Sequence, residues 1–243
     1  MMSIVISGLG WVYTTSMGYA GDIKVLPSSK GLPPIERKDI FKEPYKPFGR
    51  MDYFSKLGLA AIVFAMKDAN LHGSPHKNTG IIASSSTGCL ETDMKYQATL
   101  LPENNTLPSP ALFAYTLPSC FLGEASIRYG LTGESFVINE TDTTGMTGLG
   151  MAVDLLAVGQ IDYMLCGINN SQIDGVYDAD GIDGIDATSI QPGAVFFLLE
   201  KKNRNPGSYG NLSKNESNTS FYYKDSPIKN LHDLAQKCVK KNI

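Results

Sequence analysis

The sequence predicts an α/β protein, a class in which helices cover a sheet that is at least partly parallel. The stretch 134–170 has the pattern of a strand, a sharp turn, a helix and a second strand, which is typical of a parallel βαβ unit. The stretch 51–71 has the periodicity of a long core helix. Apolar runs over 3–7, 79–85 and 192–200 are bounded by turn residues and indicate further strands.

The composition is that of an ordinary globular protein. Of the 243 residues, 42% are apolar and 19% are charged, which suits a single domain spanning 1–243. A net charge of −3 gives no reason to expect a nucleic-acid partner. The chain opens without a basic, apolar leader and has no apolar run long enough for a membrane helix, so we expect a cytoplasmic protein.

No metal or cofactor is predicted. The four cysteines form no CxxC pair, and the glycines over 8–10 lack the full GxGxxG pattern of a dinucleotide site. The Asp- and Gly-rich stretch 174–186 fails the EF-hand pattern, because counting from Asp178 places Ile182 at the fifth position and Asp183 where glycine is required. A solvated loop is the favoured interpretation of this stretch, with metal binding as the alternative.

The first half of the chain offers no clear catalytic group. Five prolines in 19–50 predict a loop-rich excursion. Asp52 is the expected N-cap of the helix over 51–71, whose apolar stripe indicates a core helix. The strand over 79–85 runs into Ser84–Ser86, which we attribute to turn chemistry because a G-x-S-x-G pattern is absent. A helix over 89–98 and a loop over 101–108 follow.

The remaining elements centre on the βαβ unit. Ser135–Asn139 is its first strand, 141–145 its turn, Met146–Val158 its helix and Ile161–Cys166 its second strand, with Gly159 as the C-cap. In such units the first strand-to-helix corner is where chemistry is usually placed. Downstream, we expect a strand over 192–200, an exposed polar loop over 203–219, a short strand over 221–223 and a helix over 228–241.

Three segments resemble the N-terminal half of β-ketoacyl synthases. Val5–Gly10 is similar to the family's opening V-x-I-T-G-x-G, whose glycines we expect to form a tight turn. Ser109–Gly130 is similar to a segment that reads S-P-x-x-x-P-x-T-x-x-N, although Ser119 replaces the asparagine. Thr143-Thr144-Gly145 and the helix ending at Gly159 are similar to the family's nucleophile elbow.

This resemblance covers residues 3–201 and leaves a loop and a C-terminal helix over 202–243. It implies one half of a thiolase fold, with a mixed five-stranded sheet layered with helices. It also implies that the segment before the elbow lines an acyl pocket and a dimer interface. The candidate pocket and interface residues are Phe113, Tyr115, Thr116, Asp142, Thr143 and Thr144.

The nucleophile of that family is absent. The family's spacing places the catalytic cysteine at position 142, where this chain has Asp142. An aspartate of ordinary pKa is a poor nucleophile toward thioesters. Glu140 is a candidate general base, but two acidic residues near a turn are more often solvated or capping, and Asp142 could cap the following helix. His72, His76 and His232 match no family position, and we expect all three at the surface.

The resemblance therefore implies a non-catalytic, chain-length-factor-like protein that pairs with an active ketosynthase in fatty-acid or polyketide-type biosynthesis. Ser135–Asn139 would pair across the interface, and an acyl carrier protein and an acyl chain would be further partners. One alternative is a small thioesterase or dehydratase that uses Asp142 or Glu140 as a base. Another is a homodimeric module that binds acyl chains or acyl carrier protein.

Overall fold

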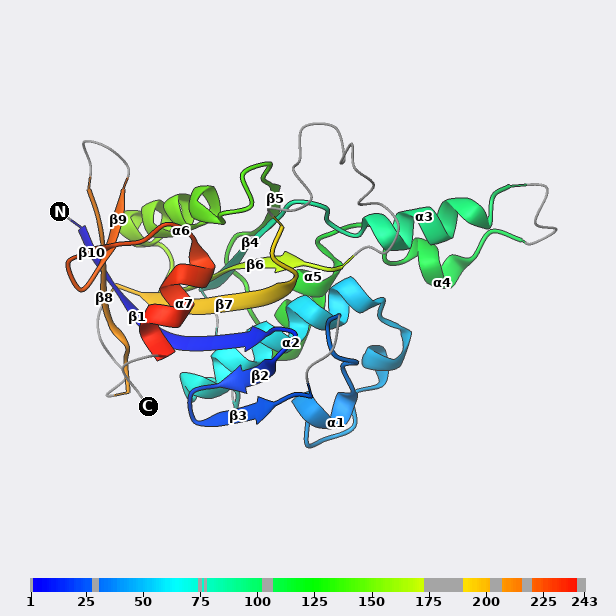
Figure 1. Ribbon diagram of the computed structural model, residues 1–243, viewed down its shortest axis with the longest axis horizontal. Helices are drawn as coiled ribbons and strands as arrows, with labels where there is room; N and C mark the ends of the chain where they lie inside the picture. Colours follow the sequence, from blue (N-terminus) through cyan, green and yellow to red (C-terminus); the bar gives the residue numbers. More distant parts are fainter. Residues whose placement is uncertain are drawn as a thin grey trace.

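The structure is a computed structural model that describes residues 2–27, 31–73, 76, 78–101, 107–172, 190–201, 207–215 and 220–239. Within these residues, one mixed sheet runs through the molecule between layers of helices (Figure 1). The strands are β1 (Met2–Val12), β2 (Ser16–Tyr19), β3 (Asp22–Val25), β4 (Thr79–Ser85), β5 (Ser135–Asn139), β6 (Tyr163–Asn170), β7 (Gly193–Glu200), β8 (Gly210–Lys214), β9 (Phe221–Tyr223) and β10 (Ser226–Pro227). The helices are α1 (Arg37–Ile40), α2 (Tyr53–Asp68), α3 (Leu90–Ala98), α4 (Pro110–Phe113), α5 (Cys120–Tyr129), α6 (Met146–Val158) and α7 (Leu231–Val239), with a 3-10 turn at Lys46–Arg50.

The expected five-stranded mixed sheet is present as the series β1-β7-β6-β4-β5. It is larger than predicted, because β8, β9 and β10 extend it beyond β1 and the β2–β3 hairpin continues from β1. β4 is parallel to β5 and β6, whereas β7 is antiparallel to both β6 and β1. β1, β4, β5 and β6 therefore point the same way, and their carboxyl ends meet at one edge of the sheet.

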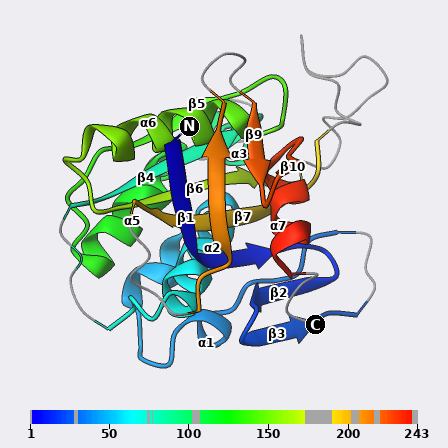
Figure 2. The same ribbon diagram turned by 90° about the vertical axis from the view of Figure 1, so that its left-hand side faces the viewer.

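Two apolar cores lie on opposite faces of the sheet. One joins α2 and α5 to side chains of β4, β6 and β7, and the other joins α6 and α7 to the opposite face of the same strands. Figure 2 shows α6 and α2 on the two sides of the strands. The predicted α/β class and the layering of helices on a mixed sheet are thus confirmed.

Several predicted elements are confirmed at their predicted bounds. β4, β5 and α6 begin and end where the sequence placed them. Asp52 is the N-cap of α2 and accepts a hydrogen bond from the Ser55 N–H, while Gly159 ends α6 in a left-handed conformation. The stretch 174–186, interpreted as a solvated loop, lies outside the described residues.

The predicted turn at the first glycines is wrong. Gly8 and Gly10 lie inside β1, which continues to Val12 beneath α2. A Cβ atom on Gly8 would stand 2.4 Å from the carbonyl oxygen of Ala65, and one on Gly10 would stand 2.3 Å from that of Ala61. The glycines therefore allow the backbones of a strand and a helix to approach closely.

The polar loop expected over 203–219 is also wrong in part, because β8 pairs there with β1. Leu212 in β8 and Tyr209 directly before it are buried and belong to the second core. The polar sequence of this segment predicted a loop, although the segment forms a strand at the side of the sheet.

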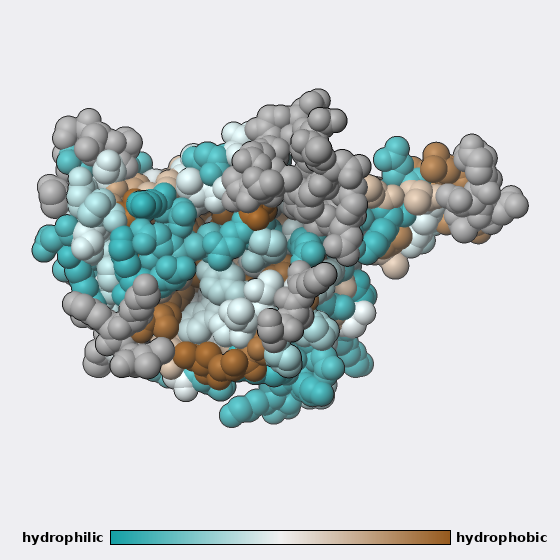
Figure 3. Space-filling view, in the orientation of Figure 1, coloured by the Kyte–Doolittle hydropathy of each residue, from teal (hydrophilic) through white to brown (hydrophobic). Residues whose placement is uncertain are grey.

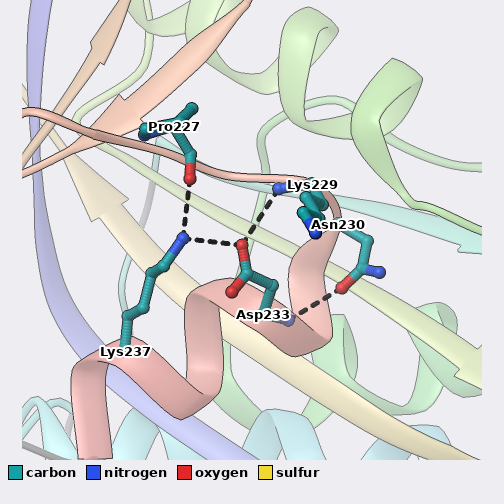
Figure 4. A network of polar contacts seen from close by, with 5 residues as sticks. All are labelled: Pro227, Lys229, Asn230, Asp233 and Lys237. Atoms are coloured by element: carbon teal, nitrogen blue, oxygen red, sulfur yellow. Dashed lines mark hydrogen bonds and ion pairs between the residues drawn. The ribbon is translucent and has the colours of Figure 1, made fainter.

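The outer side of α7 carries a polar network, seen in Figure 4. The Asp233 carboxylate accepts hydrogen bonds from the Lys229 N–H at 3.0 Å and from the Lys237 Nζ at 2.8 Å. Lys237 also donates to the Pro227 carbonyl oxygen, and Asn230 accepts from the Asp233 N–H at 2.7 Å. These contacts fix the first turn of α7 against the preceding strand.

None of the helices in the described ranges has the length and apolar composition that a bilayer crossing requires.

Candidate functional site

Buried polar side chains gather at the carboxyl edge of the parallel strands. Ser84 and Ser85 end β4, Asn169 and Asn170 end β6, and Glu140 follows β5 directly. In open α/β sheets this edge is where ligands bind and catalytic groups stand. Polar groups are costly to bury without hydrogen-bond partners. The hydrogen bonds of these side chains therefore indicate which of them have a structural role.

Glu140 is the centre of this group and is 7% exposed. Its Oε1 accepts from the Ser84 hydroxyl at 2.7 Å and from the Gly148 N–H at 3.0 Å, and its Oε2 accepts from the Gly145 N–H at 2.8 Å. Two of these donors belong to the start of α6, where the exposed backbone N–H groups favour an anion. The carboxylate thus joins β4, β5 and α6.

Asp142, which the resemblance places at the nucleophile position, is exposed and does not cap α6. Its Oδ1 accepts from the Thr144 N–H at 3.1 Å, which is a local turn contact. The N-cap of α6 is Gly145, and the carboxylate that binds the helix N–H groups is that of Glu140. Of the alternatives for Asp142, capping of α6 is therefore wrong, and an exposed, solvated carboxylate is what the structure shows.

The corner itself is strained at Thr143. This residue has φ 56°, a left-handed conformation that is rare for a β-branched side chain and costs about 1–3 kcal/mol. Gly145, at φ 72°, follows it. The neighbouring Thr144 accepts from the Met146 N–H through its hydroxyl at 3.2 Å. The sharp turn expected between β5 and α6 is present, and its apex is one residue beyond Asp142.

The serines after β4 have structural contacts. Besides the bond from Ser84 to Glu140, the Ser85 hydroxyl accepts from the Gly88 N–H at 2.9 Å, and Asn170 Oδ1 accepts from the Ser86 N–H at 2.9 Å. Ser84 is 0% exposed and Ser85 is 1% exposed. These contacts agree with turn chemistry rather than with an exposed nucleophile.

All four cysteines carry thiols that resist ionisation. Burial raises the pKa of Cys89 and of Cys238 to about 12, and it also raises the pKa of Cys120 and of Cys166. The thiolate is the reactive form of cysteine, so none of the four has the environment of a nucleophile at neutral pH. Cys89, Cys166 and Cys238 are buried, whereas Cys120 is partly exposed.

The expectation that all histidines lie at the surface is wrong for His232. This residue is 6% exposed, and its Nδ1 lies 2.8 Å from the Tyr13 hydroxyl. The adjacent Leu231 N–H donates to the Thr144 carbonyl oxygen at 3.0 Å, so α7 starts directly beside the corner. Sequence reasoning missed this pair because Tyr13 and His232 are 219 positions apart.

Burial of His232 predicts a pH-dependent stability. Desolvation lowers the pKa of its imidazole to about 4 in the folded chain, against about 6.5 when unfolded. Between these values only the unfolded chain takes up the proton, so the free energy of unfolding should fall by up to about 3 kcal/mol as the pH drops. Urea unfolding from pH 7 to pH 4 measures this, with His232→Gln as the comparison. An equally steep loss in that variant would assign the effect to other groups.

The expected pocket residues lie in two places. Phe113, 61% exposed, stacks on Tyr96 with 5.4 Å between ring centroids, and the Thr116 hydroxyl donates to the Phe113 carbonyl oxygen. Tyr115 is buried and donates to Glu124. It lines a pocket of about 340 Å³ together with Arg50, Ala114, Cys120, Gly123, Glu124 and Ile127. Phe113, Thr116 and the corner residues Asp142–Thr144 do not line that pocket. Their assignment to an acyl pocket or a dimer interface stays a prediction.

The comparisons with known proteins agree on one family. The family model for the β-ketoacyl synthase N-terminal domain matches residues 37–176. The chain is 29% identical over 120 residues to the 3-oxoacyl-[acyl-carrier-protein] synthase 2 of Vibrio cholerae serotype O1, which covers 49% of this chain and 29% of that protein. The chain therefore spans less than a third of the length of that relative.

Solved ketosynthases share the fold at low identity. One is the ketosynthase ApeO in complex with its chain length factor ApeC from Xenorhabdus doucetiae, with a TM-score of 0.60 at 19% identity. That match covers 83% of this chain and 80% of the matched chain. Another is the ishigamide ketosynthase/chain length factor, with a TM-score of 0.61 at 16% identity over 82% of this chain and 58% of the matched one.

Proposed function

The chain belongs to the β-ketoacyl synthase N-terminal domain family, and from this premise we propose that it is a non-catalytic, chain-length-factor-like partner of an active ketosynthase. The system would be one of fatty-acid or polyketide-type biosynthesis, with an acyl carrier protein delivering the acyl chain. The observation that carries the proposal is the corner after β5, which keeps the sharp, strained turn of an elbow but holds Asp142 instead of a thiol.

The chemistry of the described residues supports a non-catalytic role. Condensation needs a thiolate that holds the acyl group, and burial suppresses ionisation of all four cysteines. The solved complex of a ketosynthase with its chain length factor from Xenorhabdus doucetiae shares this fold, which is compatible with a partner role.

Two surface features support association with a partner. β5 stands at the end of the sheet, and among the described strands it pairs only with β4. Its sequence, Ser-Phe-Val-Ile-Asn, contains none of the charges or prolines that usually protect a free edge.

The second feature is an arm formed by α3 and α4, which projects from the body in Figure 1. Large apolar side chains are exposed along this arm, in the turn before α5 and near the end of α5. They are Met94, Leu100, Leu101, Leu107, Phe113, Leu117 and Ile127. Exposed apolar surface of this extent is typical of a protein interface.

The proposal predicts that blocking the β5 edge abolishes pairing. The Glu134 carbonyl and the Glu140 N–H both bond to β4, so strand alternation directs the Val137 N–H away from it. Val137→Pro removes that outward donor and should weaken the association at least about tenfold, because proline cannot pair across a strand edge. The measurement is a pull-down from the native host with mass spectrometry, followed by an acyl carrier protein loading assay on the recovered ketosynthase.

The matched control is Thr147→Ala, an exposed position at the start of α6, which should leave recovery of the ketosynthase unchanged. Circular dichroism on both variants separates loss of pairing from loss of folding. Recovery of this chain without any ketosynthase, or equal recovery with Val137→Pro, would refute the partner role.

The alternative of a thioester-processing enzyme differs in its base. Glu140 already accepts three hydrogen bonds in a buried site, which disfavours it as a base. Asp142 is exposed and remains the base for this alternative. Thioester turnover by the isolated chain that vanishes in Asp142→Asn would favour the enzyme. A stable homodimer that binds acyl chains without turnover would favour the binding module.

A further inference from the structure

A second concave site lies between α7 and the hairpin of β2 and β3. It is a groove of about 390 Å³. It is lined by Trp11, Tyr13, Ser16, Ile23, Val25, Ala235, Gln236 and Val239, none of which carries a charge. Figure 3 shows apolar surface over the β2–β3 hairpin, below α7. The volume falls within the range of roughly 300–1,000 Å³ that small-molecule sites occupy.

The polar groups of the two aromatic side chains of this groove, Trp11 and Tyr13, are engaged in hydrogen bonds within the protein. The Trp11 Nε1–H donates to the Ser16 hydroxyl at 3.1 Å, and the Tyr13 hydroxyl lies 2.8 Å from His232 Nδ1. These contacts hold both aromatic rings in place. They also occupy the indole N–H and the phenol hydroxyl, so these two groups do not bind a ligand. What remains toward the groove is aromatic and aliphatic surface, which favours a hydrocarbon.

The rim of the groove carries exposed apolar side chains. Val25 is 80% exposed and Ile23 is 38% exposed, although both lie beside a concave surface where an apolar ligand could cover them. On the other rim, Gln236 is exposed, and Lys237 is paired with Asp233. One rim of the groove is thus apolar and the other is polar.

The size of the groove favours a small molecule over a protein as its ligand. Eight residues line the groove, whereas a stable protein interface takes about 20–30 residues on each side. We propose that the groove binds the uncharged hydrocarbon chain of a small amphiphile, with the chain against Trp11 and Val25 and the polar head at the border near Gln236. This site is independent of the strained corner and of pairing with a ketosynthase.

The chain offers a direct test, because Trp11 is its only tryptophan. Dodecanoic acid with a bromine at its terminal carbon, added below its micellar concentration to the full chain alone, should quench Trp11 fluorescence saturably. Unlabelled dodecanoic acid should reverse the quenching by competition. Val25→Asp places a charge on the apolar rim and should weaken binding at least about tenfold. Val158→Asp, on an exposed valine of α6, is the matched control and should bind as the unmodified chain does.

The outcomes are distinguishable. Absence of saturable quenching, or equal quenching with Val25→Asp, overturns the proposal. Shielding of Trp11 from acrylamide by a co-purified protein, without quenching by the brominated acid, makes the groove a protein contact and also overturns it. Because the assay contains no ketosynthase, its result does not depend on whether the pairing experiment with Val137→Pro succeeds.

Discussion

Replacing Glu140 by alanine is expected to lower the free energy of unfolding by about 4 kcal/mol, because it leaves buried hydrogen-bond donors without their charged acceptor. The change leaves the Gly145 and Gly148 N–H groups and the Ser84 hydroxyl buried without their acceptor. It also removes the anion at the start of α6. Urea unfolding followed by circular dichroism measures the loss.

Asp142→Ala is the matched control for Glu140→Ala, since it removes a carboxylate two positions away. Asp142 is exposed and accepts one local bond, so this variant should change the stability by no more than about 0.5 kcal/mol. Glu140→Gln, which keeps the shape but sets an amide against backbone donors, should fall between the two. Similar losses for Glu140→Ala and Asp142→Ala would contradict the assignment of Glu140 as the carboxylate that holds this corner together.

Gly10→Ala is expected to destabilise the fold by about 3 kcal/mol or more, because overpacked contacts force the backbone apart. The added Cβ would lie 2.3 Å from both the Ala61 carbonyl oxygen and the Ala65 nitrogen, and 2.6 Å from the Phe64 Cβ. Two of these atoms are backbone and cannot turn away. The expected result is a large fall in the thermal midpoint, or no soluble protein at all.

The matched control is Gly150→Ala in α6, where nothing lies within 4 Å of the added Cβ. Alanine is favoured over glycine in a helix by about 1 kcal/mol, so this variant should be slightly more stable than the unmodified chain. Together the two substitutions separate steric crowding from the general effect of replacing glycine. Unchanged stability of Gly10→Ala would mean that α2 does not pack this closely on β1.

The sequence predicted the helices and strands that are marked by their own residues, and it missed features that depend on contacts between distant segments. β4, β5 and α6 were predicted at their observed bounds because apolar runs, helical spacing and Gly159 mark both ends of each element. The strand β8 was missed, since a short polar strand is defined by its pairing with β1 rather than by its own composition. The role of Gly8 and Gly10 was missed because the helix that requires them lies about fifty residues downstream.

The candidate site shows the same division. The sequence correctly located a sharp corner between β5 and α6, but it offered Asp142 as a candidate helix cap, whereas Glu140 binds the helix N–H groups. Only the fold places Ser84 against Glu140 and brings His232 to Tyr13, across 56 and 219 positions. Such pairs have no signal in a single sequence, because neither residue type nor spacing specifies a contact between distant strands and helices.

The edge of β5, which among the described strands pairs only with β4, also affects the expected stability of this protein in the cell. An unprotected strand edge, together with exposed apolar side chains on the α3–α4 arm, favours aggregation and attracts chaperones and proteases as long as it stays uncovered. Unassembled copies would therefore be cleared while assembled copies persist. Under the proposed pairing, the supply of the partner, rather than the rate of synthesis of this chain, would set how much of it accumulates.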